Sequence, residues 1–123
     1  MSGNNFVCDT NIILYLLGGD TSLADILEDK QIYVSFIAEI ELLSFKSINE
    51  SEKKQVQLFL GQCSIFDINN DIKEIAINIR KTTSLKIPDA IISATSIYLN
   101  IPIISADKKL SAVKELSLIL YEK

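Results

Sequence analysis

The sequence contains no histidine and no tryptophan among its 123 residues. The absence of histidine excludes histidine metal ligands, histidine general bases and Ser-His-Asp triads. Any metal ligand or general base must therefore come mainly from carboxylates. The two cysteines, Cys8 and Cys63, stand apart without a CxxC pair, which argues against a zinc cluster.

Long apolar runs are also missing. The longest, Ile12 to Leu17, is far too short to span a bilayer. The first residues of the chain are neither basic nor followed by a long apolar stretch, so no signal peptide is expected. We therefore expect a cytoplasmic protein with no membrane segment, and isolated cysteines agree with a reducing compartment. Cys8 lies in an apolar run and is expected to be a buried, inert thiol.

What remains is the composition of an ordinary globular protein, with 48% hydrophobic and 23% charged residues. The length fits one domain over residues 1–123, and no repeat or linker divides it. The formal net charge is −4, from 16 acidic and 12 basic residues. This balance argues mildly against nucleic-acid binding, which usually needs a basic surface. The objection weakens if four of the acidic residues bind cations.

Short apolar runs alternate with helical patterns along the chain. We expect strands at 6–8, 32–34, 64–66, 102–105 and 118–120. In the first half of the chain, helices are expected at 12–17 before Gly18-Gly19, from a cap at Thr21 or Ser22 to Leu27, and from the Ser35 cap to about Ile48. In the second half, they are expected from an Asn49–Glu52 capping box to about Leu60, after an Asn70 cap, and from Pro88 to Tyr98. Because the strands are continuous apolar runs, the sequence predicts an α/β fold with a parallel sheet covered on both faces.

Two aspartates directly follow predicted strands. Asp9 comes after Phe6-Val7-Cys8, and Asp107 comes after Ile104-Ser105-Ala106. Ligands of parallel sheets bind at the carboxyl ends of the strands, so both carboxylates are candidates for a site there. Each could instead serve only as a cap for the helix that follows it.

Two further carboxylates are candidates for the same site. Asp89 follows Pro88, where the helix dipole alone favours an acidic residue by roughly 0.3–1 kcal/mol. Glu41 lies in a largely apolar helical segment, about 40° from Ile37 at about 100° per residue. A carboxylate beside an apolar face is costly unless it is paired or binds a metal. The chain's only arginine, Arg80, or a lysine could provide a structural ion pair instead.

A metal gives these carboxylates a reason to gather. Two like charges 4 Å apart cost about 4 kcal/mol at an effective dielectric of 20. A divalent cation reverses the sign of that interaction, and oxygen ligands suit magnesium or manganese. Such ions activate water and stabilise the charge of phosphodiester cleavage. The residues therefore predict a metal-dependent nuclease.

The motifs together resemble the PIN-domain family, and within it the VapC-type toxins of toxin–antitoxin pairs. They are Asp9-Thr10-Asn11, Ser35 to Glu41-Leu42, Asp89-Ala90-Ile91-Ile92-Ser93-Ala94 and Ile104-Ser105-Ala106-Asp107. The resemblance covers essentially the whole chain. It implies a three-layer α/β/α fold and an endoribonuclease that depends on Mg²⁺ or Mn²⁺. It also implies a homodimer and a small antitoxin partner whose peptide can obstruct the active site.

Carried over by position, the resemblance assigns catalytic and metal-binding roles to Asp9, Glu41, Asp89 and Asp107. Asn11 and Ser105 match positions that support the site. The chain departs from the family at Ala38, where relatives often carry threonine, and in having a single arginine. The RNA contacts are consequently undefined: Lys86, Lys108 and Lys109 could meet phosphates or be ordinary solvated surface.

Other functions compete with this hypothesis. The chain could be a PIN-type nuclease of RNA processing that is not a toxin, or an inactive PIN-like module that only binds a partner. A phosphoacceptor receiver domain would need adjacent acidic residues after the first strand, where this chain has Asp9 alone. A haloacid-dehalogenase-like phosphatase would need an aspartate in place of Asn11.

Overall fold

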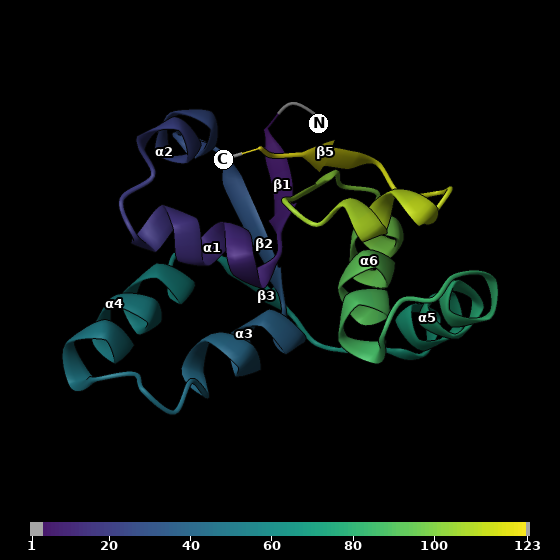
Figure 1. The fold of residues 1–123 in the computed structure, drawn as a ribbon, viewed down its shortest axis with the longest axis horizontal. Helices are drawn as coiled ribbons and strands as arrows, with labels where there is room; N and C mark the ends of the chain where they lie inside the picture. Colours follow the sequence, from purple (N-terminus) through teal and green to yellow (C-terminus); the bar gives the residue numbers. More distant parts are fainter. Residues whose placement is uncertain (1–3, 123) are drawn as a thin grey trace.

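The computed structural model describes residues 4–122 and contains a five-stranded sheet between two groups of helices (Figure 1). The strands lie in the order β3-β2-β1-β4-β5, and every neighbouring pair is parallel. Their bounds are β1 Asn5–Cys8, β2 Gln31–Ser35, β3 Ser64–Phe66, β4 Ile103–Ser105 and β5 Leu118–Leu120. This arrangement confirms the expected α/β fold with a central parallel sheet.

Helices cover both faces of the sheet. In Figure 1, one group lies to the left, formed by α1 Thr10–Leu17, α2 Thr21–Leu27, α3 Phe36–Leu43 and α4 Glu50–Leu60. The other lies to the right, formed by α5 Asn70–Thr82, α6 Ile87–Leu99 and the 3₁₀ helix η1 Lys108–Ala112. The fold therefore has the three α/β/α layers that were expected. No helix among the described residues is both long and apolar enough to cross a membrane.

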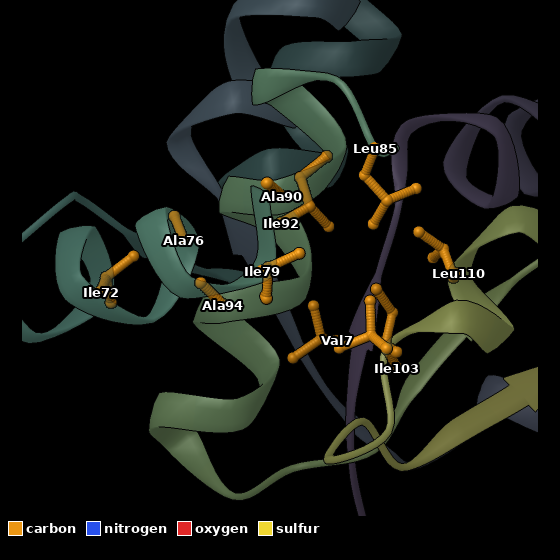
Figure 2. Packing of buried hydrophobic residues seen from close by; sticks show 11 residues of the cluster. Val7, Ile72, Ala76, Ile79, Leu85, Ala90, Ile92, Ala94, Ile103 and Leu110 are labelled. Atoms are coloured by element: carbon orange, nitrogen blue, oxygen red, sulfur yellow. The ribbon is translucent and has the colours of Figure 1, made fainter. Parts of the chain in front are cut away.

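Each face of the sheet has its own hydrophobic cluster. Val7 and Ile103 pack against α5 and α6, as Figure 2 shows, while their neighbours Cys8 and Ile104 pack against α1 to α4. Successive strand residues point to opposite faces, so both sides of β1 and β4 are buried. This double burial explains why the strands are continuous apolar runs. Cys8 is 1% exposed as expected, and burial raises its pKa.

The α4 helix begins where the sequence predicts. The Glu52 N–H donates to Asn49 Oδ1 at 2.8 Å, and the Asn49 N–H donates to Glu52 Oε1 at 3.1 Å. These reciprocal bonds form the predicted capping box. They satisfy two of the N–H groups that a helix start otherwise leaves unpaired.

The residues that cap α2 and α5 differ from the predicted ones, because a neighbouring side chain makes the capping hydrogen bond. Asp20, rather than Thr21 or Ser22, caps α2, since its Oδ1 accepts from the Leu23 N–H at 3.0 Å. Asn69 caps α5 in place of Asn70. In each case the residue that caps the helix directly precedes the predicted one. Its side-chain oxygen is placed to accept an otherwise unpaired N–H of the first turn, from Leu23 in α2 and from Ile72 in α5.

Helices α1 and α3 also differ in extent from the prediction. The first begins at Thr10, because Asp9 is its cap, and not at Ile12. The α3 helix ends at Leu43 instead of reaching Ile48. The backbone of Asn49 must be extended to cap α4, so the chain has to leave the helical conformation before it.

Candidate active site

A polar cavity lies at the carboxyl edge of the sheet, beyond the ends of the adjacent strands β1 and β4. Its volume is about 390 Å³. It is lined by Asp9, Thr10, Asn11, Glu41, Ser44, Phe45, Asp89, Ile92 and Asp107. All four carboxylates singled out in the sequence therefore share one cavity, although they come from four separate segments of the chain. Their catalytic and metal-binding roles remain predictions.

Asp9 is the most deeply placed of the four, with 9% of its surface exposed. Its Oδ1 accepts the Ile12 N–H at 3.1 Å, so the residue does cap α1 while it lines the cavity. Burial raises the pKa of Asp9, and hydrogen bonds from Ser105 and Ile12 oppose this rise. The charges of Asp107 and Asp89 raise the pKa further. The negative charges of the neighbouring aspartates therefore contribute to the raised pKa of Asp9.

Asp107 follows β4 and caps η1, where its Oδ1 accepts from the Lys109 N–H at 2.9 Å. Its own N–H donates to Ser105 Oγ at 3.0 Å. Ser105 is fully buried and hydrogen-bonds both Asp9 and the backbone of Asp107. Asp9 and Asp107 thus each cap a helix and also line the cavity, so both roles considered from the sequence are present.

Asp89 lies in the first turn of α6 and is half-buried. Burial raises its pKa, and the charges of Asp107 and Glu41 raise it further. Lys109 and Lys86 lower the pKa of Asp89, but they act more weakly than its acidic neighbours. The cavity is therefore dominated by negative charge.

Glu41 has a partner that the sequence did not indicate. The Thr10 hydroxyl donates to Glu41 Oε1 at 2.5 Å. The suggested ion pair with Arg80 is wrong, because Arg80 Nη1 donates to the Leu85 carbonyl at 2.9 Å. No local pattern links Thr10 with Glu41, so this contact needed the fold to be known. Ser44 was within reach of prediction, since residues three apart on a helix share a face.

The remaining candidates lie around the cavity in different ways. Asn11 lines it from an exposed position. Ala38 is fully buried in the cluster beneath α1 to α4. Lys86, Lys108 and Lys109 are exposed, and two of them act electrostatically on Asp89.

The donor set of the cavity fits a hydrated divalent cation. Within residues 4–122, no group of three or more acidic, cysteine or histidine side chains is already arranged to hold a metal ion. Magnesium keeps several waters and is usually bound through one or two carboxylates together with substrate phosphates. A cavity of this size with oxygen donors and raised carboxyl pKa values meets that requirement.

Comparisons with known proteins agree with this description. A family model described as PIN domain matches residues 6–116. No curated protein matches the sequence.

Among solved structures, VapBC2 from Rickettsia felis bound to a promoter DNA fragment has a TM-score of 0.85 at 20% identity, covering 96% of this chain and 99% of that chain. A toxin–antitoxin complex from Klebsiella pneumoniae has a TM-score of 0.81 at 27% identity, covering 95% and 98%. VapBC-1 from nontypeable Haemophilus influenzae has a TM-score of 0.79 at 22% identity, covering 94% and 97%.

Proposed function

Because the chain belongs to the PIN domain family, we propose that it is a metal-dependent endoribonuclease and the toxin of a toxin–antitoxin pair. The observation that carries the proposal is the gathering of Asp9, Glu41, Asp89 and Asp107 around one cavity. Burial raises the pKa of Asp9 and Asp89, and the charges of neighbouring carboxylates raise it further, so the cavity favours a bound cation. Residues 1–123 act as a single nuclease unit in this proposal.

In this proposal some side chains bind the cation, and others hold those ligands in place or contact the RNA. The four carboxylates would hold Mg²⁺ or Mn²⁺, and the chemistry supplied by such an ion would be activation of water and stabilisation of charge on the phosphate. Ser105 supports the site because it bonds Asp9 and the backbone of Asp107. Asn11 orients RNA or water at the exposed rim of the cavity. Exposed lysines near the rim, such as Lys109, meet the RNA phosphates.

The partners follow from the same proposal. The similar structures include one named as a toxin–antitoxin complex, which supports an antitoxin partner for this chain. In the proposal this partner is small and its peptide blocks the cavity. RNA is the substrate, the chain forms a homodimer, and it acts in the cytoplasm. Each of these points is open to direct measurement.

A cleavage assay tests the proposal. The purified protein is incubated with RNA and Mn²⁺ or Mg²⁺, with a chelator as the comparison, and Asp9→Asn is assayed beside it. Asp67→Asn is the matched control, since Asp67 is exposed and does not line the cavity. We expect cleavage only with the metal, and a loss of roughly 100-fold or more for Asp9→Asn, because the metal supplies several kcal/mol of transition-state stabilisation.

The outcomes separate the competing functions. Cleavage that persists in chelator would contradict metal dependence. Sequencing of the products from total RNA distinguishes a toxin, which cuts a cellular RNA and arrests growth, from a processing nuclease, which trims a precursor. A protein that binds an antitoxin and cuts no RNA under any metal is an inactive binding module.

A further inference from the structure

Glu41 is placed differently from the other carboxylates of the cavity. Asp9 and Asp107 accept hydrogen bonds from backbone N–H groups next to them in the chain, which fixes their side chains. Glu41 lies inside α3, and its longer side chain has more rotamers to restrict. Within residues 4–122, the hydroxyl of Thr10 is the one group that donates a hydrogen bond to the Glu41 carboxylate.

Thr10 is well suited to hold another residue in place. It is the first residue of α1 and directly follows Asp9, whose carboxylate caps that helix. The branched side chain of threonine has few rotamers, so its hydroxyl direction is limited. The bond joins residues 31 apart in sequence and links the start of α1 to α3. One dipeptide therefore supplies a cavity carboxylate and the anchor for a second one.

The hydrogen bond also makes the two carboxylate oxygens of Glu41 different from each other. Oε1 accepts from Thr10, while Oε2 accepts no hydrogen bond from the described residues. Glu41 and Asp89 line the same cavity, and the charge of Glu41 adds to the rise in the pKa of Asp89 that burial and Asp107 cause. Without an anchor, repulsion from these neighbours favours rotamers that carry the carboxylate toward solvent.

We infer that Thr10 is a positioning residue, whose hydroxyl holds Oε1 of Glu41 in the cavity and leaves Oε2 available to a divalent cation. This inference rests on the proposed function, because it assumes that the cavity binds such an ion. Thr10 itself need not touch the ion or the RNA. Its effect on metal binding passes through Glu41.

Manganese affinity of the metal-free protein, measured by titration calorimetry without RNA, tests this role. Thr10→Val removes the hydroxyl at nearly constant shape, and Thr10→Ser keeps a hydroxyl. We expect Thr10→Val to weaken Mn²⁺ binding roughly 10-fold, as loss of a partner of a metal ligand typically does. Thr10→Ser is expected to stay within about 2-fold of the wild type. Thr82→Val is the matched control, because its hydroxyl bonds the Asn78 carbonyl on the exposed side of α5.

A double-mutant cycle shows whether Thr10 acts through Glu41. In the Glu41→Gln background, Thr10→Val should cause no further loss of Mn²⁺ affinity. Additive losses would overturn the inference, as would a Thr10→Val protein that binds Mn²⁺ like the wild type. Thr10→Ala repeats the measurement without the added methyl group of valine.

The same titration distinguishes failure of this inference from failure of the proposed function. A wild-type protein that binds no Mn²⁺ and cleaves no RNA with it overturns both, whereas one that cleaves RNA without binding Mn²⁺ in this titration overturns only the positioning role. A wild-type protein that binds Mn²⁺ with an affinity insensitive to the Thr10 hydroxyl overturns only the positioning role. If Thr10→Ser binds Mn²⁺ as weakly as Thr10→Val does, the role of Thr10 is packing, and this result also overturns the positioning role.

Discussion

The first two turns of α6 separate two unlike hollows of the molecule. On one side, Asp89 and Ile92 line the acidic cavity. On the other side, Ile87, Ala90 and Ile91 line an apolar groove of about 480 Å³ between α6 and α5. Residues three apart on a helix share a side, so this one segment presents two different chemistries.

The difference between the hollows lies in what each costs the protein. The acidic cavity brings like charges together and raises the pKa of Asp89, which is unfavourable without a cation. The groove leaves apolar surface in water, with Ile87 57% exposed and Ile77 51% exposed. Its charged lining residues Lys73, Arg80 and Lys81 are all cationic. We expect the proposed activity to depend on the acidic cavity and not on the apolar groove, and four experiments test this contrast.

The largest expected effect is on RNA cleavage. Asp89→Asn should lower the rate by roughly 100-fold or more, because it removes a proposed cation ligand. Ile87→Ser, a change on the same turn but facing the groove, should alter the rate by less than about 2-fold. Initial rates with Mn²⁺ measure both variants. A comparable loss in Ile87→Ser would place the groove in the RNA-binding surface and end the contrast.

Metal binding should stabilise the wild type and not the variant. At a Mn²⁺ concentration of about 100 times Kd, a ligand that binds only the folded state adds about 2.7 kcal/mol to the free energy of unfolding. Thermal unfolding with Mn²⁺ and with chelator measures this shift for the wild type and for Asp89→Asn. Equal shifts in the two proteins would mean that the ion binds elsewhere.

Two buried hydroxyls farther along α6 should respond in opposite directions. Ser93 Oγ is buried and has no hydrogen-bond partner among residues 4–122, whereas Thr95 Oγ1 donates to the Ile91 carbonyl at 2.8 Å. Ser93→Ala should raise the free energy of unfolding by about 1 kcal/mol, and Thr95→Val should lower it by a similar amount. Urea unfolding of both variants checks the signs. Destabilisation by Ser93→Ala would show that this hydroxyl has a partner in solution.

The smallest effect concerns pH in the metal-free protein. Because the folded-state pKa of Asp89 is raised, its contribution to stability is present below the ordinary value of 3.8 and is lost as pH rises through the raised value. The wild type should therefore lose stability relative to Asp89→Asn as the pH rises above about 4 and through the raised pKa, leaving the variant equally or more stable above it. Urea unfolding in chelator at several pH values tests this. The opposite trend would indicate a stabilising ion pair at Asp89.

Local sequence signals predicted the sheet and the strand-end aspartates well. Strands β3 and β5 lie at the predicted residues, because short apolar runs bounded by polar residues have few other places in a compact fold. Asp9 and Asp107 could be placed at the same edge because parallel neighbours end together. Gathering of the carboxylates in one cavity followed from this topology.

Other features depend on contacts that no local pattern encodes. The Thr10–Glu41 bond joins α1 to α3, and Arg80 bonds a nearby carbonyl where a distant carboxylate was considered. The apolar groove arises from how α5 packs on α6, so an exposed Ile77 looks the same in the sequence as a buried isoleucine. The α2 cap was misplaced by one residue because three consecutive residues, from Asp20 to Ser22, are all of capping type.

The central position of β1 has a consequence for when the sheet and the cavity can be completed during synthesis. This first strand pairs on one side with β2 and on the other with β4, which lies much later in the chain at Ile103–Ser105. Asp9 thus leaves the ribosome long before its neighbour Asp107 exists. A chain interrupted before Asp107 lacks one wall of the cavity and part of its sheet. In the proposed nuclease, the complete acidic cavity would therefore form only after β4 and Asp107 have been made.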